Sequence, residues 1–310
     1  MAEKKFIEIN GLKHFFVEYI KDKDKPVVLY VHGGPAVSES LVGWEMAAAT
    51  DTYLNWVFYD ERGSGRTYLC NPESVGNYGE LHGDLLEILK YLNARFERKI
   101  YLMAHNYGTI MALRIARDFP EYVAGYIGYS QLIDMTGISK VRLERVKELA
   151  AIAGSKRDIK LADKIFATAG EDVDRDKLTS KQISRMNVLF SKYNVAGGAD
   201  KNLMTRIPKS PLYEMSDLKI LMGAPKMGAH LAAEVRNVNL FSESMKYEVP
   251  VMFIAGDWDY QCPCTVAAEY IDRMEAPYKK MALIKDVGAS AMTEAPVEFW
   301  DEIKSFFSCT

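Results

Sequence analysis

The feature that most constrains this chain is an alternation of short apolar runs with helical patterns along its first 130 residues. Four short, continuous apolar runs are typical of strands buried on both faces: 27–31, 55–59, 100–104 and 123–129. Residues 81–96 carry apolar side chains at helical spacing, and a second helical pattern over 110–119 stops at Pro120. Strands and helices that alternate in this way predict a parallel sheet with right-handed crossovers, and therefore an α/β fold.

A β-hairpin precedes this alternation, and a long helical block interrupts it. Residues 6–9 and 12–20 flank Asn10-Gly11, which is the strongest short-range signal for a hairpin. From 134 to 246 strand patterns give way to charged helical ones, in which apolar residues recur every three positions: Leu143, Val146, Leu149 and Ile152. Helical patterns follow at 159–169 and 181–193, and the alternation then resumes with a strand at 249–255, a helix at 265–274, a strand at 280–284 and a helix at 296–307. We therefore predict a core of 1–133 and 247–310 that carries a helical cap of 134–246.

Composition excludes several classes of protein. The chain has 310 residues, of which 48% are hydrophobic and 26% charged, so a disordered polymer is excluded. Acidic and basic residues are interleaved and the net charge is -3, so the sequence shows no basic patch of the kind that binds nucleic acid or an anionic membrane. Because the sequence also shows neither a signal-peptide pattern nor a membrane-spanning apolar run, we expect a cytoplasmic protein whose partner is a small molecule or a peptide. Oligomeric state stays open.

The four cysteines do not predict a disulfide scaffold or a metal site. They are scattered along the chain, and Cys262-Pro-Cys264 lacks the two-residue spacer of a redox or zinc pair. The glycine-rich loop of residues 59–66 has neither of the spacings that cradle a nucleotide phosphate. We therefore expect no cofactor and no metal.

Polar, glycine-rich segments follow several of the predicted strands. His32-Gly-Gly-Pro-Ala36 comes directly after the run at 27–31, where backbone N–H groups could approach an oxyanion. Ala104-His-Asn-Tyr-Gly108 lies at a strand-to-helix junction, the place where a nucleophile elbow carries its serine. Its central residue is Asn106, which tolerates the positive φ of an elbow, but its carboxamide cannot be activated as an oxygen or sulfur nucleophile.

The last two predicted strands lead to the places where a catalytic acid and base would stand. Gly256-Asp-Trp-Asp259 follows the first of them, and Asp286-Val-Gly-Ala-Ser290 follows the second. A triad needs a nucleophile, an acid and a histidine in this chain order. Position 289 is alanine.

Taken together, these segments resemble the α/β-hydrolase fold and, within it, the proline iminopeptidase family. His32–Ala36 resembles the family's His-Gly-Gly-Pro-Gly oxyanion loop, with Ala36 in place of the last glycine. Residues 59–67 resemble its Tyr-Asp-Gln-Arg-Gly-x-Gly-x-Ser stretch, residues 256–263 its acid segment, and Glu294-Ala-Pro296 its Glu-x-Pro. The resemblance implies a mostly parallel central sheet flanked by helices, with an inserted helical cap, and hydrolysis of a peptide, amide or ester bond.

The resemblance also implies a role for each matching position. The nucleophile position is Asn106, the acid is Asp259 and the base position is Ala289, while the N–H groups of Gly34 and Tyr107 would form the oxyanion hole. In this family, acidic cap residues bind the free amino group of a substrate, which makes Glu234 a candidate for that role. The alternative is that Glu234 lies on a solvated helix face. His230, also in the predicted cap, is a candidate ligand contact.

None of the five histidines occupies the base position. We expect His105, which precedes the elbow, to be a satisfied core histidine, and His32 to make a structural hydrogen bond. Three readings stay open: a natural pseudoenzyme, a hydrolase whose nucleophile and base were deliberately replaced, and a protein that uses Asp259, Asn106 and the oxyanion amides to bind and polarise a carbonyl without a covalent intermediate.

Overall fold

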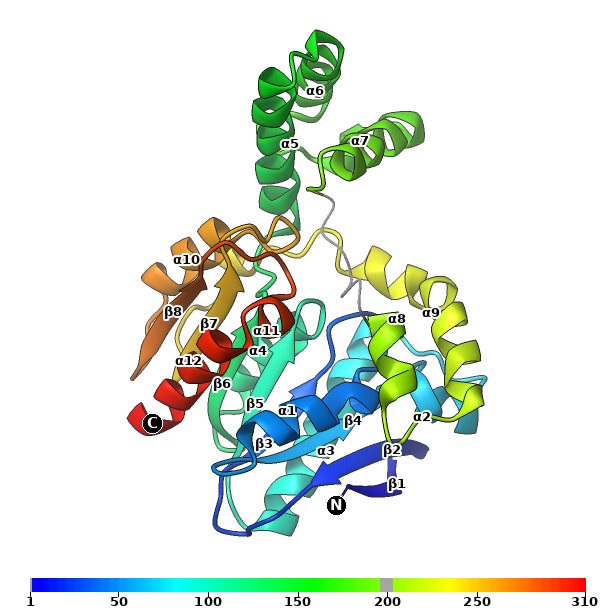
Figure 1. The fold of residues 1–310 in the computed structure, drawn as a ribbon, viewed down its shortest axis with the longest axis vertical. Coiled ribbons are helices and arrows are strands. Elements are labelled where there is room, and N and C mark those ends of the chain that lie inside the picture. Colours follow the sequence, from blue (N-terminus) through cyan, green and yellow to red (C-terminus); the bar gives the residue numbers. More distant parts are fainter. Residues whose placement is uncertain (1, 196–202) are drawn as a thin grey trace.

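The computed structural model describes residues 2–195 and 203–310, and its centre is an eight-stranded sheet (Figure 1). The strands lie in the order β1-β2-β4-β3-β5-β6-β7-β8. Their bounds are β1 (Glu3–Ile9), β2 (Leu12–Tyr19), β3 (Val27–Val31), β4 (Asn55–Tyr59), β5 (Ile100–His105), β6 (Val123–Tyr129), β7 (Val251–Gly256) and β8 (Lys279–Ile284). Strands β3 to β8 run parallel, and the β1–β2 hairpin joins antiparallel to β4. The predicted mostly parallel sheet is confirmed.

The hairpin forms where the sequence predicts it. Asn10 and Gly11 both adopt positive φ, at +48° and +73°, as a two-residue turn that matches strand twist requires. Ile9 pairs with Leu12 directly beside this turn. The turn therefore sets the register of the whole hairpin.

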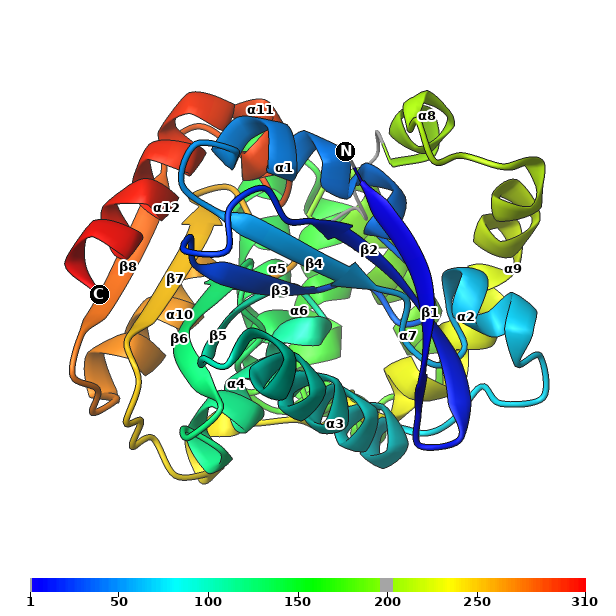
Figure 2. The ribbon, with the colours of Figure 1, turned by 90° about the horizontal axis from the view of Figure 1, so that it is seen from below.

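Helices cover both faces of the sheet because alternate side chains of each buried strand point to opposite sides. In β3, Leu29 packs with α3 and α4, whereas Tyr30 packs on the opposite face with α1 and α12. Figure 2 shows α3 and α4 on one side of the sheet and α1 and α12 on the other. The core helices are α1 (Gly43–Thr50), α2 (Gly65–Cys70), α3 (Tyr78–Phe96), α4 (Gly108–Asp118), α10 (Cys264–Arg273), α11 (Ala291–Glu294) and α12 (Pro296–Cys309). The sequence analysis did not predict α1 or α2, which are short and have no long apolar period.

The first three helices of the long insertion between β6 and β7 have a core of their own. They are α5 (Met135–Ile152), α6 (Lys156–Ala169) and α7 (Ser180–Lys192), with the short 3-10 helix η2 (Arg175–Lys177) before α7. Leu143 and Val146 are fully buried in this small core, which Tyr260 of the sheet domain also contacts. Ile152 continues the sequence period but is 81% exposed, because α5 ends there.

The rest of the insertion lies against the sheet domain instead. It contains α8 (Leu203–Arg206) and α9 (Met215–Glu234). Asp217 of α9 accepts two hydrogen bonds from the guanidinium of Arg66 in α2, at 3.0 and 2.9 Å. A Cβ at Gly228 would lie 2.5 Å from the carbonyl oxygen of Pro35, so the backbone of α9 passes directly over the loop of residues 32–36.

Three further 3-10 turns complete the described elements: η1 (Ser40–Val42), η3 (Ile207–Lys209) and η4 (Leu240–Ser242). Over the described residues, no helix is both long and apolar enough to span a bilayer.

Candidate active site

Asn106 lies at a sharp turn between β5 and α4 that has the backbone of a nucleophile elbow. Its φ is +43°, and its N–H donates to the carbonyl of Tyr129 at 3.0 Å. A Cβ at Gly108 would lie 2.6 Å from the carbonyl oxygen of His32, so only glycine allows this close approach. Asparagine accepts the left-handed backbone at low cost, and the turn therefore survives without a serine.

The side chain of Asn106 is held by a cysteine from the acid loop. Its Nδ2 donates to Sγ of Cys262 at 3.2 Å. Cys262 is 1% exposed, and burial raises the pKa of its thiol well above the ordinary value. The sequence analysis assigned Cys262 no disulfide and no metal site, and it did not predict this contact; the place of Cys262 three residues after Asp259 is the one sequence signal that could have pointed to it. A neutral thiol and a carboxamide occupy the position of the nucleophile.

Asp259 follows β7 and stands at the acid position. It is 2% exposed, and its Oδ1 accepts the N–H groups of Gln261 and Cys262 at 2.8 and 2.9 Å. Its Oδ2 is buried and accepts no hydrogen bond of ordinary length within residues 2–195 and 203–310, although the hydroxyl of Ser130 lies near enough to this carboxyl to offset part of the effect of burial on its pKa. Burial raises the pKa of Asp259. In a triad a carboxylate oxygen in this position binds the imidazole of the base.

Ala289 stands at the base position, in the loop after β8. Its carbonyl accepts the hydroxyl of Tyr129 at 2.7 Å, and the same hydroxyl oxygen accepts the N–H of Met292 at 3.3 Å. The N–H of Gly288 donates to Oε2 of Glu294 at 2.9 Å. The loop is thus held by contacts that need no imidazole, and the methyl group of Ala289 cannot bind a proton.

One of the two predicted oxyanion donors is engaged within the protein. The N–H of Tyr107 donates to the carbonyl of Gly33 at 3.1 Å, so it does not face a free site in this structure. Gly34 lies in a tight turn whose carbonyl accepts the N–H of Val37 at 3.2 Å. Ala36 has a φ of +61°, a left-handed conformation that favours the glycine of the family loop.

The two histidines nearest to this loop make structural contacts, as predicted. His105 places Nδ1 3.2 Å from Oε1 of Glu39, and its ring stacks on that of Tyr129 at 4.5 Å. Burial alone would raise the pKa of Glu39, but the charge and hydrogen bond of His105 lower it to about 2. Burial lowers the pKa of His32 to about 4, and its Nδ1 lies 3.1 Å from the carbonyl of Gly34.

The two candidate residues of α9 contact the loop before α3. Oε2 of Glu234 accepts the N–H of Tyr78 at 2.8 Å, and Nε2 of His230 lies 2.7 Å from the carbonyl of Gly76. Both side chains are exposed. These contacts attach α9 to the core, and the charge of Glu234 also reaches the hydroxyl of Tyr107, the residue after Asn106, where it adds to the effect of burial in raising the pKa of that hydroxyl.

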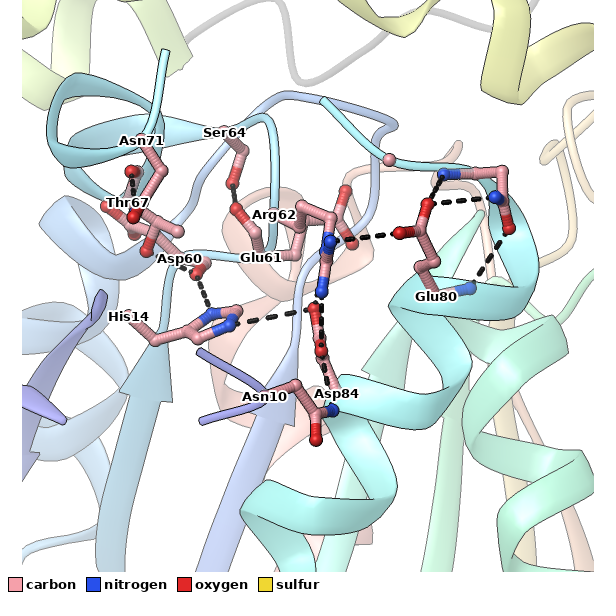
Figure 3. A network of polar contacts seen from close by, with 12 residues as sticks. Asn10, His14, Asp60, Glu61, Arg62, Ser64, Thr67, Asn71, Glu80 and Asp84 are labelled. Carbon is pink, nitrogen blue, oxygen red and sulfur yellow. Dashed lines mark hydrogen bonds and ion pairs between the residues drawn. The ribbon is translucent and has the colours of Figure 1, made fainter. Parts of the chain in front are cut away.

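The loop that follows β4 is fixed by a buried polar network, shown in Figure 3. Arg62 donates to both carboxylate oxygens of Asp84, at 2.8 and 3.0 Å, and to Glu80 at 3.1 Å. His14 lies 3.6 Å from Asp84, and burial lowers the pKa of its imidazole. One residue before Arg62, Glu61 accepts the N–H of Ala36 at 3.3 Å. Through this bond, the loop after β4 supports the loop of residues 32–36.

Within residues 2–195 and 203–310, no three His, Cys, Asp or Glu side chains are arranged so that they could hold a metal ion.

Comparisons with known proteins agree with the fold. No family model matches the chain. It is 23% identical to the probable aminopeptidase YbaC of Bacillus subtilis, with 96% of this chain and 94% of that protein covered. It is also 23% identical to the proline iminopeptidase of Saccharolobus solfataricus, with 98% and 92% covered.

A solved structure shares the whole architecture. The proline iminopeptidase-related protein of Thermus thermophilus superimposes with a TM-score of 0.62 at 16% identity, with 99% of this chain and 98% of that chain covered. At this identity the likeness establishes the fold alone. The chain therefore has the α/β-hydrolase fold and, in its sequence, resembles the proline iminopeptidases.

Proposed function

We propose that this proline-iminopeptidase-like chain binds a small carbonyl compound, a peptide, amide or ester, at the elbow and does not hydrolyse it through a covalent intermediate. The contact of Asn106 with Cys262 carries the proposal, because it places a carboxamide and a neutral thiol where the covalent bond to substrate would form. Neither group is activated: a nucleophile needs an adjacent base or a lowered pKa. Ala289 supplies no base.

Slow hydrolysis remains compatible with this function. In serine proteases, removal of triad members leaves about 10³–10⁴-fold acceleration over water from the oxyanion hole and from binding. Here the N–H of Tyr107 also donates to the carbonyl of Gly33, which removes one of the two oxyanion donors. We therefore expect turnover far below that of a hydrolase with a complete triad.

A second candidate function is proton transfer without hydrolysis. Asp259 favours it, because burial raises the pKa of its carboxyl and its Oδ2 accepts no hydrogen bond of ordinary length in the described chain. A carboxyl of this kind can exchange a proton with a bound carbonyl compound. Under either candidate function, the chain lacks the aminopeptidase activity for which its relatives are named.

The test is the double variant Asn106→Ser with Ala289→His, assayed on p-nitrophenyl esters and aminoacyl p-nitroanilides. We expect hydrolysis to rise by at least about 10³-fold over the wild type, since the nucleophile and the base of a triad act as a unit. Ala289→His alone is the matched control and should change the rate little.

The wild type tests the other half of the proposal. Incubation with a serine-directed fluorophosphonate should leave it unlabelled, and native mass spectrometry should show a retained peptide amide or ester. Stoichiometric labelling at or beside the elbow would contradict the loss of covalent chemistry. Absence of any retained ligand at high micromolar concentration would contradict binding.

A further inference from the structure

The carboxyl group of Asp259 has hydrogen-bond donors on one of its two oxygens. Oδ1 accepts the N–H groups of Gln261 and Cys262, whereas Oδ2, which is also buried, accepts no hydrogen bond of ordinary length in the described chain. The hydroxyl of Ser130, near this carboxyl, is buried and likewise has no partner of ordinary length there. A buried carboxylate is costly unless its oxygens meet donors or a counter-charge. A donor added at Oδ2 of Asp259 would therefore be strongly stabilised.

No cation of the described residues is paired with this carboxyl. Within residues 2–195 and 203–310, Asp259 forms no ion pair with a lysine, an arginine or a histidine. Arg142 of α5 reaches the same loop, but its Nη2 donates to the carbonyl of Gln261 at 3.0 Å and its Nε donates to the carbonyl of Tyr260. These bonds fix the loop after β7 from the insertion, and they leave Oδ2 of Asp259 to a group from outside.

The loop after β7 packs against the loop after β8. The N–H of Trp258 donates to the carbonyl of Val287 at 2.9 Å, which joins the residue before Asp259 to the second residue before Ala289. In a triad, the carboxylate of the acid and the imidazole of the base meet across these two loops. Here Ala289 ends in a methyl group and is only half-buried, so the base position is open to solvent and carries no nitrogen of its own.

The elbow adjoins both loops. The N–H of Cys262 donates to Asp259 at 2.9 Å, and its Sγ lies 3.2 Å from Nδ2 of Asn106. Tyr129 joins the elbow to the loop after β8, because its carbonyl accepts the N–H of Asn106 at 3.0 Å and its hydroxyl donates to the carbonyl of Ala289 at 2.7 Å. The carboxyl, the elbow and the base position therefore lie together at one edge of the sheet.

We infer that Asp259 and the base position form a subsite for a protonated nitrogen, so that the carbonyl compound at the elbow also carries an amine or an imidazole whose N–H donates to Oδ2 of Asp259. The inference rests on the proposed function, since it names the class of carbonyl compound. A charge-assisted hydrogen bond is stronger than a neutral one, and burial strengthens it further. The family resemblance predicts an acidic cap residue for such a nitrogen, but Glu234 accepts the N–H of Tyr78.

The experiment compares imidazole with thiazole as ligands of the full chain, by calorimetry at neutral pH and low ionic strength. The two rings have the same size, but thiazole has no N–H and stays unprotonated. We expect imidazole to bind at least about tenfold more tightly, the effect of a hydrogen bond to a charged group. In Asp259→Asn this preference should fall to within about twofold. The variant keeps Oδ1 for the two N–H groups of its loop, and circular dichroism would establish that it is folded.

Two further variants locate the subsite. Ala289→His places an imidazole of the chain itself at the base position, so free imidazole should lose its advantage over thiazole. Asp286→Asn is the matched control, because Asp286 is exposed in the loop after β8 and has a φ of +60°, which asparagine tolerates. It should keep the preference of the wild type. A preference that survives in Asp259→Asn or in Ala289→His would overturn the subsite.

N-acetylprolinamide, a carbonyl compound without a basic nitrogen, separates the two proposals. If imidazole binds through Asp259 while N-acetylprolinamide does not bind, the subsite stands and the proposed function fails. If N-acetylprolinamide binds but imidazole has no advantage over thiazole, the subsite is overturned and carbonyl binding stands. If neither compound binds, both proposals are overturned.

Discussion

The elbow after β5 and the loop after β8 both lack the side chain that the family resemblance predicts, and they differ in the residue that stands there. At the elbow, Asn106 keeps the left-handed backbone and gains a partner in Cys262. In the other loop, Ala289 offers only its carbonyl, which Tyr129 holds. The elbow is maintained by the residue at its centre, whereas the base loop is maintained by its neighbours. The backbone of both loops is therefore kept without the family's catalytic side chains.

The comparison is tested most severely at the elbow. Replacing Asn106 with valine should reduce the free energy of unfolding by about 3 kcal/mol, because a β-branched residue is strained at positive φ and the bond to Cys262 is lost. Asn106→Gly, which keeps the backbone but not the bond, should cost about 1 kcal/mol or less. Urea denaturation measures both. Equal losses in the two variants would show that the backbone of residue 106 does not hold the turn.

The next effect concerns the support of the elbow by Glu39. The pKa of this carboxyl is lowered to about 2, so its contribution to stability is complete above its ordinary pKa of 4.5 and is lost as pH falls from there towards about 2. Between about pH 5 and pH 3 the wild type should lose about 2 kcal/mol more than Glu39→Gln. Unfolding curves at the two pH values measure the difference. If the wild type and Glu39→Gln lose the same free energy of unfolding between the two pH values, the charge of Glu39 does not stabilise the elbow.

The base loop should respond to its neighbour rather than to residue 289. Tyr129→Phe removes a hydroxyl that bonds the carbonyl of Ala289 and the N–H of Met292, and we expect a cost of about 1–2 kcal/mol. Ala289→Ser should stay within about 0.5 kcal/mol of the wild type, as surface substitutions usually do. A larger cost for Ala289→Ser than for Tyr129→Phe would reverse the assignment.

The smallest effect is a gain of stability from a change in the loop of residues 32–36. Ala36 has a φ of +61°, where glycine meets no Cβ penalty. We expect Ala36→Gly to raise the free energy of unfolding by about 0.5–1 kcal/mol, since the relief of strain exceeds the added entropy of the unfolded chain. Thermal unfolding would detect it. A lower melting temperature would mean that contacts of the Ala36 methyl group outweigh the strain.

Much of the fold was predictable because it rests on local patterns. The hairpin follows from Asn10-Gly11, and strands β3, β4 and β6 have the predicted bounds because their apolar runs are continuous. The elbow follows from its place between a strand and a helix. The positions of α8 and α9 against the sheet domain were not predictable, because they depend on pairs such as Arg66 and Asp217, which are 151 residues apart.

Within the site, the sequence by itself determined which chemical groups are present: an asparagine at the elbow, an acid at 259 and an alanine at 289. The side chains that are present limit the reactions that a site can carry out, however the chain folds. Three contacts of the site depend on how the chain folds in space: Asn106 with Cys262, the N–H of Tyr107 with the carbonyl of Gly33, and the N–H of Tyr78 with the carboxylate of Glu234. These contacts join segments that no local period relates, and they form only when the strands bring their carboxyl ends to one edge of the sheet.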